Sequence, residues 1–213
     1  MRIGLIDYGA GNLGSVRRAL EELDVSIQLL REPEAAALTQ IDGYILPGVG
    51  HFADCAAQLR ERGWMQAIPE QVQQGKSLLG ICVGMQMLAT CSHESHDQQP
   101  AAGLNLIPGE VKHLQQWACP HRVPHVGWNA VARRAADEPL LAQIPDDTDF
   151  YFTHSYAFAC EDETDIAAQC DYGLPVTAAV RRGRVWGTQF HPEKSSRAGL
   201  RLLRNFVEAG APC

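Results

Sequence analysis

The stretch that decides the fold is LLGICVGMQMLA, residues 78–89. An apolar run typical of a buried strand ends at Cys82, and a run of helix-forming residues follows. Gly80 and Gly84 stand two positions before and after the cysteine, which allows a sharp turn and a close passage of strand and helix. This spacing is the nucleophile-elbow pattern with cysteine in place of serine. We therefore expect Cys82 to be a nucleophile at the N-terminus of a helix, where the dipole favours the thiolate. A buried cysteine at the end of a core strand is the alternative.

Strand and helix patterns alternate on both sides of this stretch. Expected strands cover residues 2–7, 25–30, 43–47 and 77–81, and expected helices cover 15–23, 52–62 and 64–74. Such alternation predicts a parallel sheet that helices cover on both faces. After about residue 105 come strand-like segments at 111–114, 126–133, 149–154, 176–180 and 184–191, and a helical period at 195–209. We expect an α/β fold with a mixed, mostly parallel sheet, in a single domain over residues 1–213.

The amino-acid composition limits which partners the protein is expected to bind and in which cellular compartment it is expected to lie. The formal net charge is −7, which argues against broad binding to nucleic acids or anionic membranes, because both need a basic surface. The apolar run at residues 3–6 stops at Asp7 and is too short for a signal peptide or a membrane span. The seven cysteines include no CxxC pair, so reduced thiols are expected. These features favour a cytoplasmic protein.

A cysteine nucleophile needs a base, and the base needs an orienting group. The segment QFHPE, residues 189–193, places His191 two positions before Glu193. In an extended segment residues i and i+2 point the same way, so the carboxylate is expected to accept the second imidazole N–H. We predict that His191 is the base and acid for Cys82 and that Glu193 orients it. A purely structural histidine is the alternative.

Acyl transfer also needs N–H donors for the developing oxyanion. The residue after a nucleophile supplies one donor, here Val83, and a neighbouring strand–helix loop supplies the other. The segment LPGVG, residues 46–50, closes the third expected strand and is rich in exposed backbone. We expect Val49 to give the second donor, although an ordinary turn between strand and helix would produce the same pattern.

Two other segments suggest different functions. Gly9, Gly11 and Gly14 form a GxGxxG motif between an expected strand and helix, and Glu32 follows the second strand. This predicts either a dinucleotide-binding protein or only a tight turn, and the segment alone leaves both open. His93 and His96 suggest a metal site, but they are three positions apart rather than four and no second ligand cluster has metal-like spacing. We expect a polar loop over residues 92–103 and no metal.

The chain resembles the class I, or triad, glutamine amidotransferases over almost its whole length. The segments that carry the resemblance are IDYGAGNLGSV, LPGVGHF, LLGICVGMQML, GLNLIPGEV, VPHVGWN, FYFTHSY and GTQFHPEKS. Within the family, DYGAGNL, PGVGHF and PHVGWN resemble the glutaminase subunits of imidazole glycerol phosphate synthase. The resemblance implies a flavodoxin-like α/β fold without a cofactor. It also implies that the loop around Asn12 lies near a partner, which makes the dinucleotide interpretation the runner-up.

The resemblance further implies a role for each matching residue. Cys82 is the expected nucleophile, His191 the base and acid, Glu193 its orienter, Gly50 and Gln86 line the glutamine pocket, and Glu94 lies near the substrate's amino group.

The implied partner is a (β/α)8 cyclase in a one-to-one heterodimer, which receives ammonia from glutamine. In histidine biosynthesis that cyclase converts PRFAR, a phosphoribulosyl nucleotide, to imidazole glycerol phosphate and AICAR, an aminoimidazole carboxamide ribotide. Trp128 in PHVGWN is expected either at this interface or in the core. A catalytically silent binding subunit is a third hypothesis, against which the intact Cys82, His191 and Glu193 argue.

Overall fold

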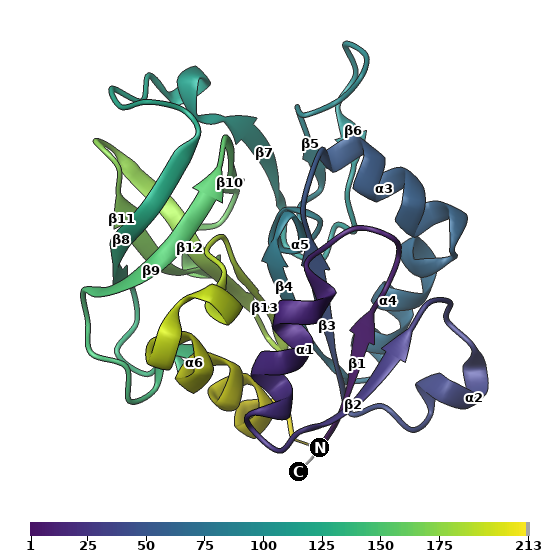
Figure 1. The fold of residues 1–213 in the computed structure, drawn as a ribbon. Coiled ribbons are helices and arrows are strands. Elements are labelled where there is room, and N and C mark those ends of the chain that lie inside the picture. The colour runs from purple at the N-terminus through teal and green to yellow at the C-terminus, as the bar shows by residue number, and fades with distance from the viewer. Residues whose placement is uncertain (212–213) are drawn as a thin grey trace.

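A nine-stranded mixed sheet forms the centre of the structure, a computed structural model that describes residues 1–211 (Figure 1). Five neighbouring strands run parallel: β2 (Ser26–Leu30), β1 (Arg2–Ile6), β3 (Gly43–Gly48), β4 (Ser77–Cys82) and β13 (Val185–Thr188). The sheet continues with antiparallel pairing through β12 (Pro175–Arg182), β11 (Ile166–Asp171), β8 (His125–Arg133) and β9 (Thr148–His154). The predicted α/β fold with a mixed sheet is confirmed, and its antiparallel part is as extensive as its parallel part.

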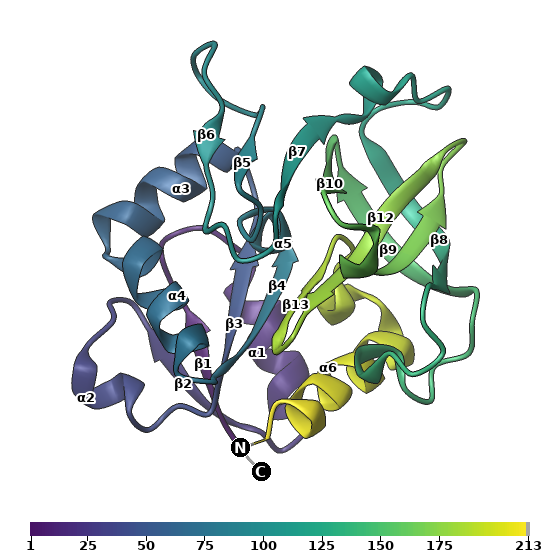
Figure 2. The same cartoon turned by 180° about the vertical axis from the view of Figure 1, so that it is seen from behind.

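Helices cover both faces of the parallel part. Figures 1 and 2 show α1 (Leu13–Glu21) and α6 (Ser196–Ala209) on one face, and α3 (Phe52–Glu61) and α4 (Trp64–Gln73) on the other. The strands between them, β3 and β4, are buried along their whole length, as expected for strands covered on both sides. Two short helices, α2 (Ala35–Leu38) and α5 (Val83–Gln86), complete the set of α-helices in the described residues. No helix in residues 1–211 is long and apolar enough to cross a membrane.

A smaller sheet lies beyond the carboxyl ends of β3 and β4 (Figure 1). Its strand order is β10 (Tyr156–Cys160), β7 (Gly109–His113), β5 (Cys91–Ser92) and β6 (Ala101–Ala102). Only Ser155 separates β10 from β9 in the chain, so no turn residues mark the point where the backbone passes from one sheet to the other. For that reason the sequence analysis did not predict β10, and it also missed β11.

Short 3₁₀ helices link several of these elements: η1 (Leu114–Trp117), η2 (Pro139–Leu141), η3 (Glu163–Asp165) and η4 (Pro192–Lys194). The topology then sets the position of the site. Gly48 at the end of β3 pairs in register with Cys82 at the end of β4, and β13 on the other side of β4 leads into residues 189–193. The segments singled out in the sequence therefore meet at the carboxyl edge of neighbouring parallel strands, where open α/β sheets bind ligands.

Candidate active site

The chain turns sharply at Cys82, as the two flanking glycines predicted. Cys82 has φ 56° and ψ −113°, a region that residues with a side chain rarely adopt and that strained functional positions often occupy. A Cβ atom on Gly84 would lie 1.8 Å from the carbonyl oxygen of Leu46, and one on Gly80 would lie 2.4 Å from the oxygen of Gly84. The glycines are therefore needed because strand, helix and neighbouring strand pass too closely for any side chain.

The helix that follows Cys82 is shorter than predicted. α5 ends at Gln86, whereas the sequence suggested a helical run through residue 89. A helix of one turn aligns only a few peptide dipoles. It therefore stabilises a thiolate at Cys82 less than a longer helix would. The main positive group available to favour a thiolate is therefore an imidazolium from elsewhere in the chain.

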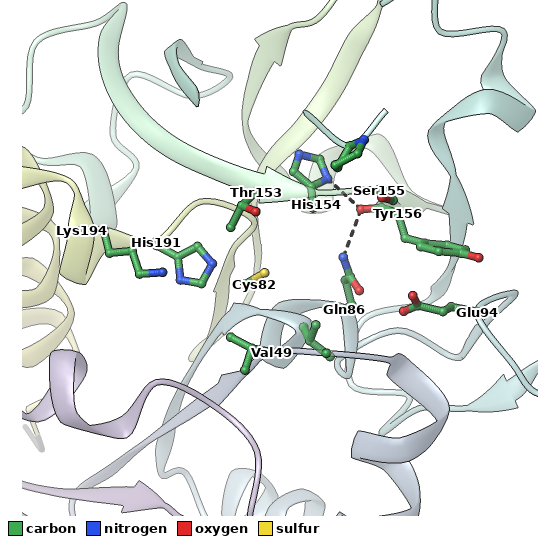
Figure 3. Close-up of a pocket in the computed structure, with 13 residues that line it drawn as sticks. Val49, Cys82, Gln86, Glu94, Thr153, His154, Ser155, Tyr156, His191 and Lys194 are labelled. Carbon is green, nitrogen blue, oxygen red and sulfur yellow. Dashed lines mark hydrogen bonds between the residues drawn. The ribbon is translucent and has the colours of Figure 1, made fainter. Parts of the chain in front are cut away.

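His191 and Glu193 form a buried pair, and Figure 3 shows the ring of His191 beside Cys82. The Nδ1–H of His191 donates to Oε1 of Glu193 across 2.8 Å, and the two side chains are only 2% and 1% exposed. The predicted contact is present, but its predicted geometry was wrong: Glu193 lies in the 3₁₀ turn η4, not in an extended segment. Two further bonds fix the backbone of His191, which donates to the oxygen of Tyr151 and accepts from the hydroxyl of Ser195.

The electrostatics of His191 favour its charged form. Burial by itself lowers the pKa of His191, but the Cys82 sulfur and the Glu193 carboxylate outweigh it and raise the pKa from 6.5 to about 9. Because Nδ1 is taken by Glu193, the remaining ring nitrogen is Nε2, which is buried and has no hydrogen-bond partner. An imidazolium whose free N–H lies beside a cysteine favours the thiolate and can pass a proton to a leaving group.

Two glutamine side chains form a chain of hydrogen bonds that ends at the Cys82 sulfur. The amide of Gln189 donates to the Cys82 sulfur at 3.7 Å, and the amide of Gln86 donates to Oε1 of Gln189 at 3.0 Å. Gln86 also donates to the carbonyl oxygen of Tyr156 (Figure 3). The sequence analysis named Gln86 as a pocket residue but missed Gln189. The available signal was its position two residues before His191.

A cavity of about 310 Å³ opens over the cysteine, a size at the lower end of small-molecule sites. It is lined by Val49, Gly50, Cys82, Val83, Gln86, Glu94, Pro124, Thr153, His154, Ser155, Tyr156, His191 and Lys194. Eight residues were predicted to act on or bind the substrate. Seven of them, including Glu94, line this cavity, and the eighth, Glu193, lies behind His191. Pro124, Lys194 and residues 153–156 lie in segments that carry the family resemblance. They were not predicted as cavity residues, because those segments alone do not indicate which side chains face the site.

Glu94 brings a partly buried carboxylate to the cavity wall. Burial raises its pKa, while the N–H of Phe52, which donates to Oε2 at 2.9 Å, acts in the opposite direction. A carboxylate with so few protein donors is a natural partner for a ligand ammonium group.

The loop after β3 forms an exposed part of the cavity wall. Val49 is 40% exposed, and its carbonyl accepts a hydrogen bond from the thiol of Cys55. Gly50 has φ 101° and open space around its α-carbon, a conformation that favours glycine. Val49 and Val83 both line the cavity that contains Cys82.

Comparison with known proteins identifies the family. The family described as glutamine amidotransferase class-I matches residues 4–209. The chain belongs to this family. Among relatives of this amidotransferase, the imidazole glycerol phosphate synthase subunit HisH of Desulfitobacterium hafniense is 46% identical over 96% of this chain and 92% of its own. The subunit of the same name from Moorella thermoacetica is 45% identical over 97% of this chain and 94% of its own.

Solved structures show the same fold at lower sequence identity. PurLQS from Thermotoga maritima matches with a TM-score of 0.75 and 16% identity, covering 98% of both chains. A glutamine amidotransferase from the same organism matches with a TM-score of 0.66 and 18% identity, over 98% of this chain and 81% of its own. The amidotransferase fold is therefore shared well beyond the range of close sequence similarity.

The GxGxxG loop of this amidotransferase lacks a feature that dinucleotide binding requires. In that fingerprint the third glycine allows the helix to pack closely on the strand, but a Cβ atom on Gly14 would meet nothing within 4 Å. Asn12 caps α1 by accepting from the N–H of Ser15, and Gly9 and Gly11 have positive φ. The loop is thus a capped, tight turn, and the dinucleotide interpretation gains no support.

Proposed function

We propose that this chain is the glutaminase subunit of an imidazole glycerol phosphate synthase. One observation carries the proposal: Cys82, the His191–Glu193 pair and the partly buried Glu94 converge on one small cavity. Relatives that share 45–46% of their residues over nearly the full chain are named as HisH subunits of that synthase. The six cysteines in residues 1–211 are free, which agrees with a reducing, cytoplasmic setting.

In the proposed first step, the Cys82 thiolate attacks the γ-carboxamide carbon of glutamine. The N–H groups of Val83 and Val49 stabilise the oxyanion as a carbon–sulfur bond forms. The carbon–nitrogen bond then breaks, and His191 gives its proton from Nε2 to the departing nitrogen. Ammonia leaves, and a glutamyl thioester remains on Cys82.

In the second step, water hydrolyses the thioester. Neutral His191 accepts a proton from the water as the oxygen attacks the carbonyl, and the same oxyanion donors act again. The carbon–sulfur bond breaks, glutamate leaves, and the thiolate–imidazolium pair is restored. Glu193 keeps Nδ1–H engaged throughout, so that Nε2 always faces the reacting atoms.

We assign substrate recognition to the opposite end of the cavity. The Glu94 carboxylate is expected to bind the α-ammonium of glutamine, and Oε1 of Gln86, which is buried without a partner, is a second acceptor. Gly50 leaves space because it has no side chain. The substrate is thereby held with its side-chain amide over Cys82.

The proposed partner is a (β/α)8 cyclase subunit in a one-to-one heterodimer. Ammonia passes to it and reacts with PRFAR to give imidazole glycerol phosphate and AICAR in histidine biosynthesis. Val126 and Trp128 on β8 are 55% and 54% exposed, and adjacent exposed apolar groups of this kind often anchor an interface. The core position considered for Trp128 was wrong.

The direct test measures glutamate release from glutamine with the purified chain, alone and with a cyclase subunit. We expect glutamine-specific hydrolysis that the cyclase stimulates, and no release from asparagine. If no glutamate appears in either condition, the chain is the silent binding subunit and the proposed function fails.

Glu193→Gln should lower glutamine hydrolysis less than His191→Ala does, by a margin of roughly ten- to a hundredfold. Both variants should lose kcat with little change in KM, because the pair acts in the transition state rather than in substrate binding. Steady-state kinetics of the two variants at saturating cyclase measure this difference. An equal loss of kcat and of glutamine affinity in Glu193→Gln would instead give the carboxylate a structural role.

Trp128→Ala should weaken the complex at least about tenfold, because central aromatic anchors contribute most of the binding free energy. The melting temperature should change little, since the side chain is 54% exposed. Leu29→Ala is the matched control: Leu29 is 46% exposed on β2, at the opposite edge of the sheet. Titration calorimetry with the cyclase compares the two. Loss of folding with unchanged affinity in the Trp128 variant would remove the residue from the interface.

A further inference from the structure

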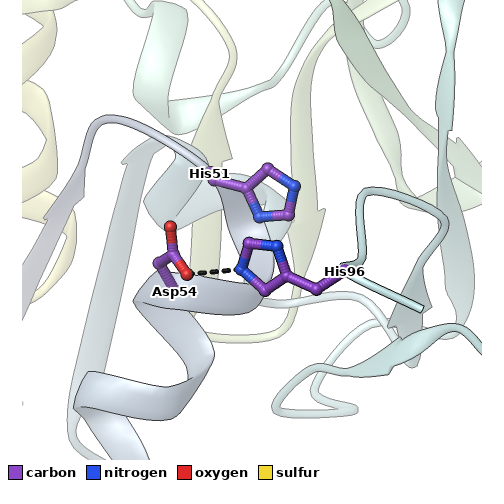
Figure 4. Close-up of side chains that lie close together, drawn as sticks. All are labelled: His51, Asp54 and His96. Atoms are coloured by element: carbon purple, nitrogen blue, oxygen red, sulfur yellow. Dashed lines mark hydrogen bonds and ion pairs between the residues drawn. The ribbon is translucent and has the colours of Figure 1, made fainter.

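Three side chains with metal-binding atoms gather beside the glutamine cavity. His51, Asp54 and His96 each place a ligand atom within 4.8 Å of the others (Figure 4). Nε2 of His96 lies 2.6 Å from Oδ1 of Asp54, and the rings of His51 and His96 stack with centroids 4.4 Å apart. This set, called here the His51 cluster, combines two imidazoles with one carboxylate.

The sequence predicted a polar loop over residues 92–103 and no metal, and the metal site that was weighed and rejected there had a different pair of ligands. His93 was paired with His96, whereas in the structure Nε2 of His93 lies 2.6 Å from Oε2 of Glu110. His96 instead reaches across to His51 and Asp54, which precede it by more than forty positions. Residues this far apart in the sequence form no recognisable motif, so the sequence alone does not indicate the His51 cluster.

The chemistry of the His51 cluster suits a borderline transition metal. Two histidines and one carboxylate are common ligands of Zn²⁺, and three protein ligands leave a fourth position for water. Nδ1 of His51 is buried and has no protein hydrogen-bond partner, so a ligand or water must satisfy it. Asp54 and His96 have side chains that are 57% and 65% exposed. The ring of His96 therefore has room to turn from its stacked position so that its in-plane lone pair meets the metal.

The three residues of the His51 cluster come from two different segments, which a bound metal would join. His51 immediately precedes α3, Asp54 lies in its first turn, and His96 lies in the loop after β5. The same loop carries Glu94, which already accepts the N–H of Phe52 at the start of α3. We propose that His51, Asp54 and His96 form a Zn²⁺-binding site that clamps the loop bearing Glu94 onto the first turn of α3. The site does not depend on the proposed glutaminase function.

The test is calorimetric titration of tag-free protein with Zn²⁺ in a Cys82→Ala background. This background removes the thiol next to His191, which would otherwise compete for the metal. We expect one bound equivalent, with affinity that falls at least about tenfold in His96→Ala and in Asp54→Asn. His93→Ala, on the same loop, is the matched control and should bind like the parent. Circular dichroism checks that each variant is folded.

Two spectroscopic results complete the test. Co²⁺ in the parent should give d–d absorption without a thiolate charge-transfer band, because the ligands are nitrogen and oxygen. Zn²⁺ should slow amide hydrogen exchange over residues 92–103 in the parent but not in His96→Ala. A thiolate band, or Zn²⁺ affinity unchanged in folded His96→Ala and Asp54→Asn, would overturn the site. Binding without slower exchange would overturn the clamp.

Discussion

Cys82→Ala is expected to lower glutamine hydrolysis by at least about 10⁴-fold, because removing a covalent nucleophile disables the whole catalytic unit. The complex with the cyclase should nevertheless make imidazole glycerol phosphate from added ammonium salt. The reason is the proposed division of labour: this chain releases ammonia, and the partner carries out the cyclisation. Glutamate release and product formation, measured separately with glutamine and with ammonium salt, give the two rates.

Cys91→Ala is the matched control for the loss of a thiol. Cys91 is partly exposed on β5 and does not line the cavity over Cys82, so this variant should keep its glutamine-dependent rate. Substantial glutamine hydrolysis by Cys82→Ala would show that another group is the nucleophile. Loss of the ammonium-dependent rate as well would mean that Cys82 supports the complex rather than the chemistry.

Local patterns were enough to predict the parallel half of the fold. The expected strands at residues 2–7, 25–30, 43–47 and 77–81 all exist, each with one boundary shifted by one residue. β3 and β4 were recognisable because fully buried strands form uninterrupted apolar runs. The position of Cys82 on a sharp turn followed from Gly80 and Gly84 alone. The strands and the turn at Cys82 were predictable because residues close in sequence, or the steric limits of the backbone, determine them.

Features that depend on long-range pairing were not predictable in the same way. The predicted pairing of His191 with Glu193 was correct, yet it arises from a 3₁₀ turn rather than an extended segment. Gln189 reaches Cys82, and residues 153–156 reach the cavity, only because β13 and β9 end near β4. The small sheet formed by β10, β7, β5 and β6 has strands as short as two residues. Periodicity cannot reveal strands of that length.

The isolated chain is expected to hydrolyse glutamine slowly even though Cys82, His191 and Glu193 are assembled. The physical reason lies in the oxyanion donors: the absence of one donor lowers kcat by about 10²–10³-fold. The second donor is assigned to the Gly48–Val49 peptide, whose rotation changes ψ of Gly48, a residue without a side chain. A peptide next to glycine can rotate at small steric cost. A resting orientation with its carbonyl towards Cys82 would suppress wasteful hydrolysis.

Binding of the cyclase and its ligand should then shift the population towards the orientation with the N–H facing Cys82. Glutamate release is measured for the chain alone, with cyclase, and with cyclase plus its nucleotide ligand, and should rise by orders of magnitude across the series. Alkylation of Cys82 by iodoacetamide is the control, because it needs the thiolate but no oxyanion donor, and its rate should change far less. Full hydrolytic activity of the chain alone would mean that Gly48, Val49 and Gly50 form an oxyanion hole already in place. If the alkylation rate rose by the same factor, the cyclase would act by increasing the reactivity of the Cys82 thiolate and not by turning the oxyanion donor.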